Sequence, residues 1–259
     1  PTGTVTFDFA DGTTPVTAVL TNGAATVTRP YTIRISSPYT ITATYNASSD
    51  FADSSGTDTH TVTRASTTTA LASSPDPSVV GQPVTFTATV TPVAPGAGTP
   101  TGTVVFSFGD GTTSVTAALT GGSATVTRPY TTRSSGLFTV TATYIGSNSF
   151  AGSSGSDPHT VNRALSATTV VSSPDPSRPG QGATVTATVT AVPPGAGTPT
   201  GSVTFTIGNR SPVTVPLADG TASTPIGNLS VGTHPITVAY PGSTDFASSS
   251  GTDTHTVTP

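Results

Sequence analysis

Hydrophobic and polar residues alternate along most of the chain, and this alternation predicts short β-strands. The clearest case is Val84–Thr91, where Val84, Phe86, Ala88 and Val90 are each followed by a threonine. Successive side chains of a strand point to opposite faces, so a period of two places an apolar row on one face and a threonine row on the other. Helical periodicity is essentially absent. We therefore expect an all-β fold.

The same pattern recurs along the chain, which indicates a tandem repeat. A run that starts at Pro1 returns almost unchanged at Pro100 and in a more divergent form at Pro199. The first two copies are 99 positions apart, and the third drifts, because His159 and His255 are 96 positions apart. A regular period of this kind marks a repeated folding unit. The repeat divides the chain into three expected modules, which are 1–64, 65–163 and 164–259.

The middle module, 65–163, contains the full set of expected strands. Two prolines flank Asp76 and prevent continued pairing there, and Gly109-Asp110 and Gly121-Gly122 are typical of tight hairpin turns. Seven short strands separated by turn signals match an Ig-like sandwich, so we expect tandem Ig-like β-sandwiches of about seven strands each, arranged end to end. The expected strands are Thr67–Leu71, Val84–Thr91, Val104–Phe108, Val115–Leu119, Ala124–Val126, Phe138–Tyr144 and one that begins at Thr160–Asn162.

Particular stretches of the sequence resemble a known family. They are TTTALASSPDPSVVGQPVTFTATVTP together with PTGTVVFSF in the middle module, and NLSVGTHPITVAYPGSTDFASSSG in the third. These residues resemble the bacterial Ig-like repeat domains that are strung in tandem on secreted and surface proteins. The resemblance covers essentially the whole chain. It implies a stalk or spacer, because members of that family rarely carry chemistry themselves.

The first module, 1–64, lacks counterparts of the strands Thr67–Leu71 and Val84–Thr91. We expect its sandwich to be incomplete, with Val5, Phe7 and Phe9 deprived of partners from a second sheet. An open apolar sheet edge is an aggregation hazard, so we interpret the chain as a segment of a longer one. Donor-strand polymerisation is the alternative, but the chain offers no spare pair of strands to donate.

The composition argues against several classes of function. Charged residues are 8% of the chain, against roughly 25% in typical soluble domains, and neither lysine nor glutamate occurs. A net charge of -4 offers no basic surface for phosphates, which disfavours nucleic-acid binding. Because cysteine is absent, each module must depend on an apolar core. No apolar run approaches the roughly 20 residues of a membrane span.

An aspartate and a histidine stand two residues apart near the end of each module. Imidazole beside carboxylate is used for metal binding and for proton transfer, yet two ligands per module are too few for a zinc site. We interpret the aspartate as a strand-entry residue and the histidine as a rim residue that the repeat has copied. The pairs are Asp58 with His60, Asp157 with His159, and Asp253 with His255.

Two further groups of residues have simple structural explanations. Asp8, Asp11 and Gly12 resemble part of a calcium loop, but the chain has no glutamate and the acidic pair is not kept in the later copies, so a hairpin turn is the better interpretation. Tyr31 and Tyr130 are the plausible exposed aromatic pair for a glycan. A corner packed over the end of the sandwich explains these tyrosines better.

Covalent and catalytic chemistry find little support in the sequence. No G-x-S-x-G elbow is present. An ester bond between a threonine and Gln82 or Gln181 is conceivable, but a structural role of these glutamines in their loops is the simpler explanation. The N-x-S sequons at Asn46, Asn209 and Asn228 matter only if the source glycosylates asparagine. We therefore predict no catalytic, cofactor-binding or metal-binding residues.

These observations lead to two hypotheses for function. The first is a non-enzymatic spacer or stalk segment of a longer extracellular or cell-surface protein, whose partners are the neighbouring repeats of the same chain. The alternative is an adhesive or fibre-forming module that binds a glycan, a protein or its own copies. Under both hypotheses we expect no cofactor, no nucleic-acid partner and a secreted or cell-surface location.

Overall fold

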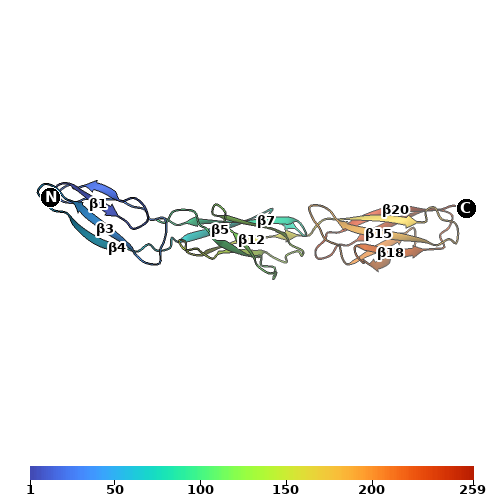
Figure 1. Ribbon diagram of the computed structural model, residues 1–259. Helices are drawn as coiled ribbons and strands as arrows, with labels where there is room; N and C mark the ends of the chain where they lie inside the picture. Colours follow the sequence, from blue (N-terminus) through green and yellow to red (C-terminus); the bar gives the residue numbers. More distant parts are fainter.

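The protein folds into three β-sheet modules that follow one another in a line. A computed structural model describes residues 1–259 and contains twenty strands and no helix. Accordingly, it holds no helix of the length and apolarity needed to cross a membrane. The two termini lie at opposite ends of an elongated molecule (Figure 1). The expected all-β fold with tandem Ig-like modules is confirmed.

Two sheets form the second module, 65–163. One is three-stranded, in the order β10-β7-β5, and the other is four-stranded, in the order β12-β11-β8-β9; neighbouring strands in both are antiparallel. A short parallel pair, β13-β6, completes the module. The strands are β5 (Thr67–Ser74), β6 (Ser78–Val79), β7 (Pro83–Pro92), β8 (Thr103–Ser107), β9 (Val115–Ala118), β10 (Ser123–Pro129), β11 (Phe138–Tyr144), β12 (Ser153–His159) and β13 (Val161–Asn162).

The third module, 164–259, repeats this topology. Its sheets have the strand orders β14-β15-β18 and β17-β16-β19-β20. The last strand now runs without a break, and its end at Val257 pairs in parallel with Ser177, as β13 pairs with β6 in the second module. The strands are β14 (Ser166–Ser173), β15 (Ala183–Ala191), β16 (Ser202–Ile207), β17 (Val213–Pro216), β18 (Thr221–Ile226), β19 (Gly232–Tyr240) and β20 (Ser249–Val257).

The last long strand of the second module begins earlier than the sequence pattern predicts. β12 occupies Ser153–His159 and pairs with β11 along its whole length, whereas the predicted strand at Thr160–Asn162 is only the two-residue β13. The pattern misses β12 because its residues, SSGSDPH, include no aliphatic side chain and so show no hydrophobic alternation. Pairing with β11 makes this segment a strand.

The core lies between the two sheets and is built from the alternating residues. The apolar row of β7 is buried as expected, with Val84, Phe86 and Ala88 at 0% exposure. Val104 and Phe106 from the opposite sheet are equally buried and belong to the same cluster. Burying a side chain of this size contributes about 1.5–3 kcal/mol, so these rows supply most of the stabilisation of a module without disulfides.

β12 passes close to β5, which joins the two sheets along one side. The Ser153 hydroxyl lies 2.8 Å from Thr67 Oγ1 and 2.7 Å from Thr69 Oγ1. A Cβ atom on Gly155, in the middle of β12, would overlap the carbonyl oxygen of Thr69. The strand therefore needs glycine at this position for close approach of the two backbones, although glycine weakens an isolated strand. Gly251 has the same role in the third module, against Thr168.

A single four-stranded sheet, in the order β2-β1-β3-β4, forms the first module. Residues 25–30, the counterpart of β10, form no strand, because the chain has no counterpart of β7 with which they could pair. Val5 and Phe7 are only half-buried, whereas their counterparts Val104 and Phe106 are fully buried. Phe9 is 7% exposed, so the expectation that it also lacks cover is wrong; the Arg29 guanidinium lies 5.7 Å from the centroid of its ring. The strands are β1 (Thr4–Asp8), β2 (Val16–Val19), β3 (Tyr39–Asn46) and β4 (Ser54–His60).

Candidate functional site

The structure buries His159, and this corrects the prediction of a rim histidine. His159 is 0% exposed and His255 is 1% exposed, whereas His60 is exposed. The ring of His159 stacks on Tyr130, with the centroids 5.3 Å apart, and meets the edge of Phe86 at 5.8 Å. The alternation of side chains along the strand could have predicted this burial. His159 is two residues from Val161, which is also buried, so both side chains point inward.

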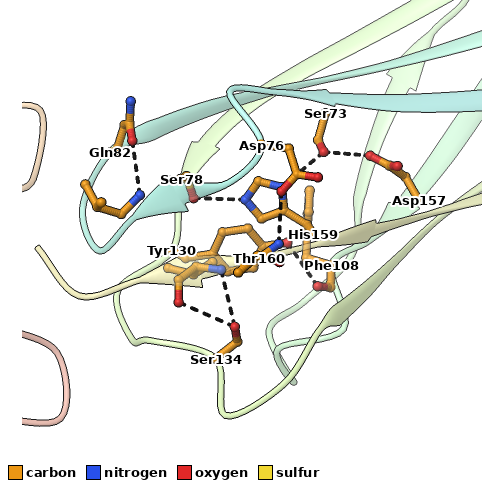
Figure 2. Close-up of polar contacts among 12 residues, drawn as sticks. Ser73, Asp76, Ser78, Gln82, Phe108, Tyr130, Ser134, Asp157, His159 and Thr160 are labelled. Carbon is orange, nitrogen blue, oxygen red and sulfur yellow. Dashed lines mark hydrogen bonds and ion pairs between the residues drawn. The ribbon is translucent and has the colours of Figure 1, made fainter.

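A chain of hydrogen bonds indicates which nitrogen of a neutral His159 ring carries the proton (Figure 2). The Ser73 hydroxyl donates to Asp157 Oδ2 at 2.6 Å, so it has no second proton for the imidazole. His159 Nδ1, 3.0 Å away, must therefore donate to Ser73 Oγ. The neutral ring then accepts at Nε2 from the Ser78 hydroxyl, at 2.9 Å. The network thus assigns the Nδ1–H tautomer.

The carboxylates of Asp76 and Asp157 lie near His159 but do not keep its ring protonated. Burial lowers the pKa of His159, and the charges of Asp76 and Asp157 offset part of this effect. Asp76 Oδ1 lies 3.3 Å from Nδ1 and also accepts the backbone N–H of Thr160 at 3.1 Å (Figure 2). Because burial disfavours the imidazolium, the ring is neutral at pH 7, which is the state in which Nε2 accepts the bond from Ser78.

Ser78, His159 and Asp76 place a hydroxyl, an imidazole and a carboxylate in the order of a hydrolytic triad. The surroundings do not suit that chemistry, because Ser78 is 1% exposed and lies in β6, which is paired with β13. A cavity of about 690 Å³ lies elsewhere, between residues 30–34 and 93–99. The cluster instead ties β5, β6 and β12 together and connects the two sheets.

The third module contains an interrupted copy of this network. Ser177 Oγ lies 2.9 Å from His255 Nε2, as in the second module. Asp253 Oδ2, however, accepts the backbone N–H of Ser172 at 2.8 Å in place of a hydroxyl. Ser172 Oγ and His255 Nδ1 are therefore both buried without a hydrogen-bond partner. The repeat has kept the residues of the cluster but not all of its bonds.

Tyr130 is packed, as the corner interpretation predicts. It is 1% exposed, its hydroxyl donates to the Phe108 carbonyl at 3.1 Å, and its ring stacks on Phe138 with the centroids 4.8 Å apart. Desolvation raises its pKa to about 12. Tyr31 is half-buried and its hydroxyl is enclosed. The two tyrosines therefore do not form an exposed glycan platform.

Asp110 forms the hairpin turn that the sequence analysis expects, and an arginine reinforces it. Asp110 Oδ1 accepts the backbone N–H and the hydroxyl of Thr112, at 3.1 and 2.6 Å. Arg128 Nη2 lies 2.7 Å from Asp110 Oδ2, and its guanidinium sits 4.4 Å from the centroid of the Phe108 ring. Sequence reasoning missed this pair; the repeated spacing of Asp11 with Arg29 is the signal that could have revealed it.

The chain has distant similarity to solved structures of other proteins. Among solved structures, the full ectodomain of mouse nectin-like molecule 4 shares 13% identity over 98% of this chain and 89% of that chain, with a TM-score of 0.34. Escherichia coli alpha-2-macroglobulin activated by porcine elastase shares 14% identity over 100% of this chain and 30% of that chain, with a TM-score of 0.32. Comparison with curated proteins finds no match.

The family comparison covers most of the chain. The pattern of the bacterial Ig-like domain (group 3) matches twice in tandem, at residues 71–162 and 169–258. Each match spans the strands of one two-sheet module, from β5 to β13 and from β14 to β20. The chain therefore belongs to the bacterial Ig-like domain (group 3) family.

Proposed function

We propose that the chain is a non-enzymatic spacer, a stalk segment that separates parts of a longer extracellular or cell-surface protein. The observation that carries the proposal is the linear order of the modules, with the termini at opposite ends (Figure 1). Each module adds length in one direction, as in other solenoid-like and repeat proteins. Membership of the bacterial Ig-like family supports this assignment.

The chemistry of the buried cluster also favours a structural role. The reactive groups Ser78 and His159 are enclosed, and their hydrogen bonds connect strands of the same module. Catalysis requires a nucleophile that a substrate can approach. A spacer requires only that the modules stay folded, which the cluster supports.

Small-angle X-ray scattering of the full chain tests the proposal. A compact globule of 259 residues has a radius of gyration of about 18 Å. The 10 residues of β7 span about 34 Å, so three modules in a row reach roughly 100 Å and have a radius of gyration of about 30 Å. We expect the larger value at every concentration. A value near that of the globule would contradict a spacer.

Self-association is a second candidate, and the first module favours it, because its single sheet has no second sheet to cover its apolar face. Val5 and Phe7 are half-buried, and Val19 on the edge strand β2 is 70% exposed. A second copy could add strands at this edge. Light scattering should then show a mass above 25.5 kDa that rises with concentration and returns to the monomer value in Val19→Lys. A constant monomer mass in the unmodified chain would exclude self-association.

A further inference from the structure

Only one residue separates the backbone hydrogen bonds that attach the linker to the second and third modules. The Val80 N–H, in the second module, donates to the Asn162 carbonyl at 3.0 Å. The Ala164 N–H donates to the Asp245 carbonyl, in the third module, at 2.9 Å. Arg163 is the single residue between these two attachments. We propose that this boundary is a rigid joint that holds the two modules at one fixed angle.

A first contact across the boundary joins two loop backbones. The Ala196 N–H, in the loop before β16, donates to the Val80 carbonyl at 3.1 Å. A Cβ atom on Gly81 would overlap the backbone of Ala196, so only glycine permits this approach. Gly81 also has a φ of 79°, which favours glycine in any case. The two loops are therefore in direct backbone contact.

A second contact joins a different pair of loops. The backbone N–H of Arg133, between β10 and β11, donates to Asp245 Oδ1 at 2.7 Å. The Arg163 side chain adds a longer bond, from Nε to the Thr244 carbonyl at 3.3 Å. A hydrogen bond to a carboxylate is stronger than one between neutral groups. Together with the linker and the Gly81 contact, this bond opposes both bending and twisting of the joint.

The second of these loop pairs also meets at the first boundary, with different chemistry. The Arg34 N–H, the counterpart of the Arg133 N–H, donates to the Ser149 hydroxyl at 3.4 Å. Asn148 Nδ2 donates to the Arg34 carbonyl at 2.8 Å. Ser149 occupies the position that Asp245 has in the third module. This loop contact thus recurs at both boundaries, and the carboxylate strengthens it at the second.

This inference goes beyond the spacer proposal, because a spacer can be either flexible or stiff. A linker of one residue, Arg163, would still leave two freely rotating backbone dihedral angles if nothing else connected the modules. Contacts at two separate loop pairs remove that freedom. The second and third modules should therefore move as one body, and the orientation of one should determine that of the other.

Distance measurement between two spin labels tests the joint. The chain has no cysteine, so Thr125→Cys and Thr254→Cys create unique labelling sites on exposed positions of the second and third modules. Double electron–electron resonance on the full chain should give one narrow distance distribution. Gly81→Ala should broaden it, because the added methyl group separates the loops. Gly180→Ala is the matched control: it has the same φ of 79° and no atom within 4 Å of the added Cβ.

A second variant covers the case in which Gly81→Ala does not fold. Asp245→Ala removes the acceptor of the Arg133 N–H and should also broaden the distribution, whereas Asp50→Ala, its exposed counterpart in the first module, should not. A broad distribution in the otherwise unmodified chain would overturn the rigid joint. So would a narrow one that neither Gly81→Ala nor Asp245→Ala changes. Elongated scattering could accompany each of these results, so the spacer proposal would stand or fall separately.

Discussion

Gly155 lies where β12 of one sheet closely approaches β5 of the other, so replacing it with alanine should destabilise the second module. The added methyl group would overlap the carbonyl oxygen of Thr69 in β5. β12 cannot move away freely, because the Ser153 hydroxyl bonds Thr67 and Thr69 across the same gap. The overlap must therefore be relieved by moving one backbone away from the other.

The size of the effect follows from two opposing contributions. Extra volume in a packed site costs about 1–3 kcal/mol. Alanine in place of glycine also restricts the unfolded chain, which stabilises the folded state by about 0.4–1 kcal/mol where the backbone permits it. We expect Gly155→Ala to lose about 1–2 kcal/mol in unfolding free energy. The counterpart Gly56 has no atom within 4 Å of an added Cβ, so Gly56→Ala should be neutral or stabilising.

Hydrogen exchange followed by mass spectrometry in increasing urea reads the modules separately. Peptides from β7 report on the second module, and peptides from β15 report on the third. Gly155→Ala should shift the β7 transition to lower urea and leave the β15 transition unchanged. The reasoning is refuted if the β7 transition stays in place, or if Gly56→Ala destabilises the first module as much as Gly155→Ala destabilises the second.

Three other predictions concern the second module. Ser78→Ala leaves the buried Nε2 of His159 without a donor and should cost about 1–3 kcal/mol in urea unfolding, whereas an unchanged midpoint would contradict the network. Burial lowers the folded-state pKa of His159, so the unfolded state binds the proton first as the pH falls. The unfolding free energy should therefore be constant above about pH 6.5 and decrease below it. A flat profile of unfolding free energy between about pH 7 and 5 would contradict this. Arg128→Lys should cost about 1 kcal/mol, because lysine cannot both reach Asp110 and stack on Phe108, and an Arg128→Lys chain as stable as the parent would disprove this role.

Local patterns in the sequence were sufficient to predict the architecture. The alternation in Val84–Thr91 identifies β7 and the face that it buries, since the side-chain period of a strand depends only on neighbouring residues. The repeat then transfers this assignment to β15 at Ala183–Ala191. Turn residues such as Gly109 and Asp110 mark the hairpin between β8 and β9 for the same reason.

The failures of prediction share a physical cause. β12 has no hydrophobic alternation, so only its pairing with β11 reveals it as a strand. The pair of Arg128 and Asp110 depends on how β10 lies over the β8–β9 hairpin, and neither residue shows this alone. In each case the deciding interaction joins segments that are distant in the sequence.

The histidine near the end of each module illustrates what the sequence determines and what only the tertiary structure decides. The sequence by itself determined most of the β-strands, their repetition and the recurrence of an aspartate two residues before a histidine. Only the tertiary structure decided that His159 is buried against Tyr130 and bonded to Ser78, 81 residues away. It also decided that Gly155 and Gly81 are contact points, one between sheets and one between modules. Alternation is a local property of the backbone, whereas burial and close approach depend on what the fold brings to the other side.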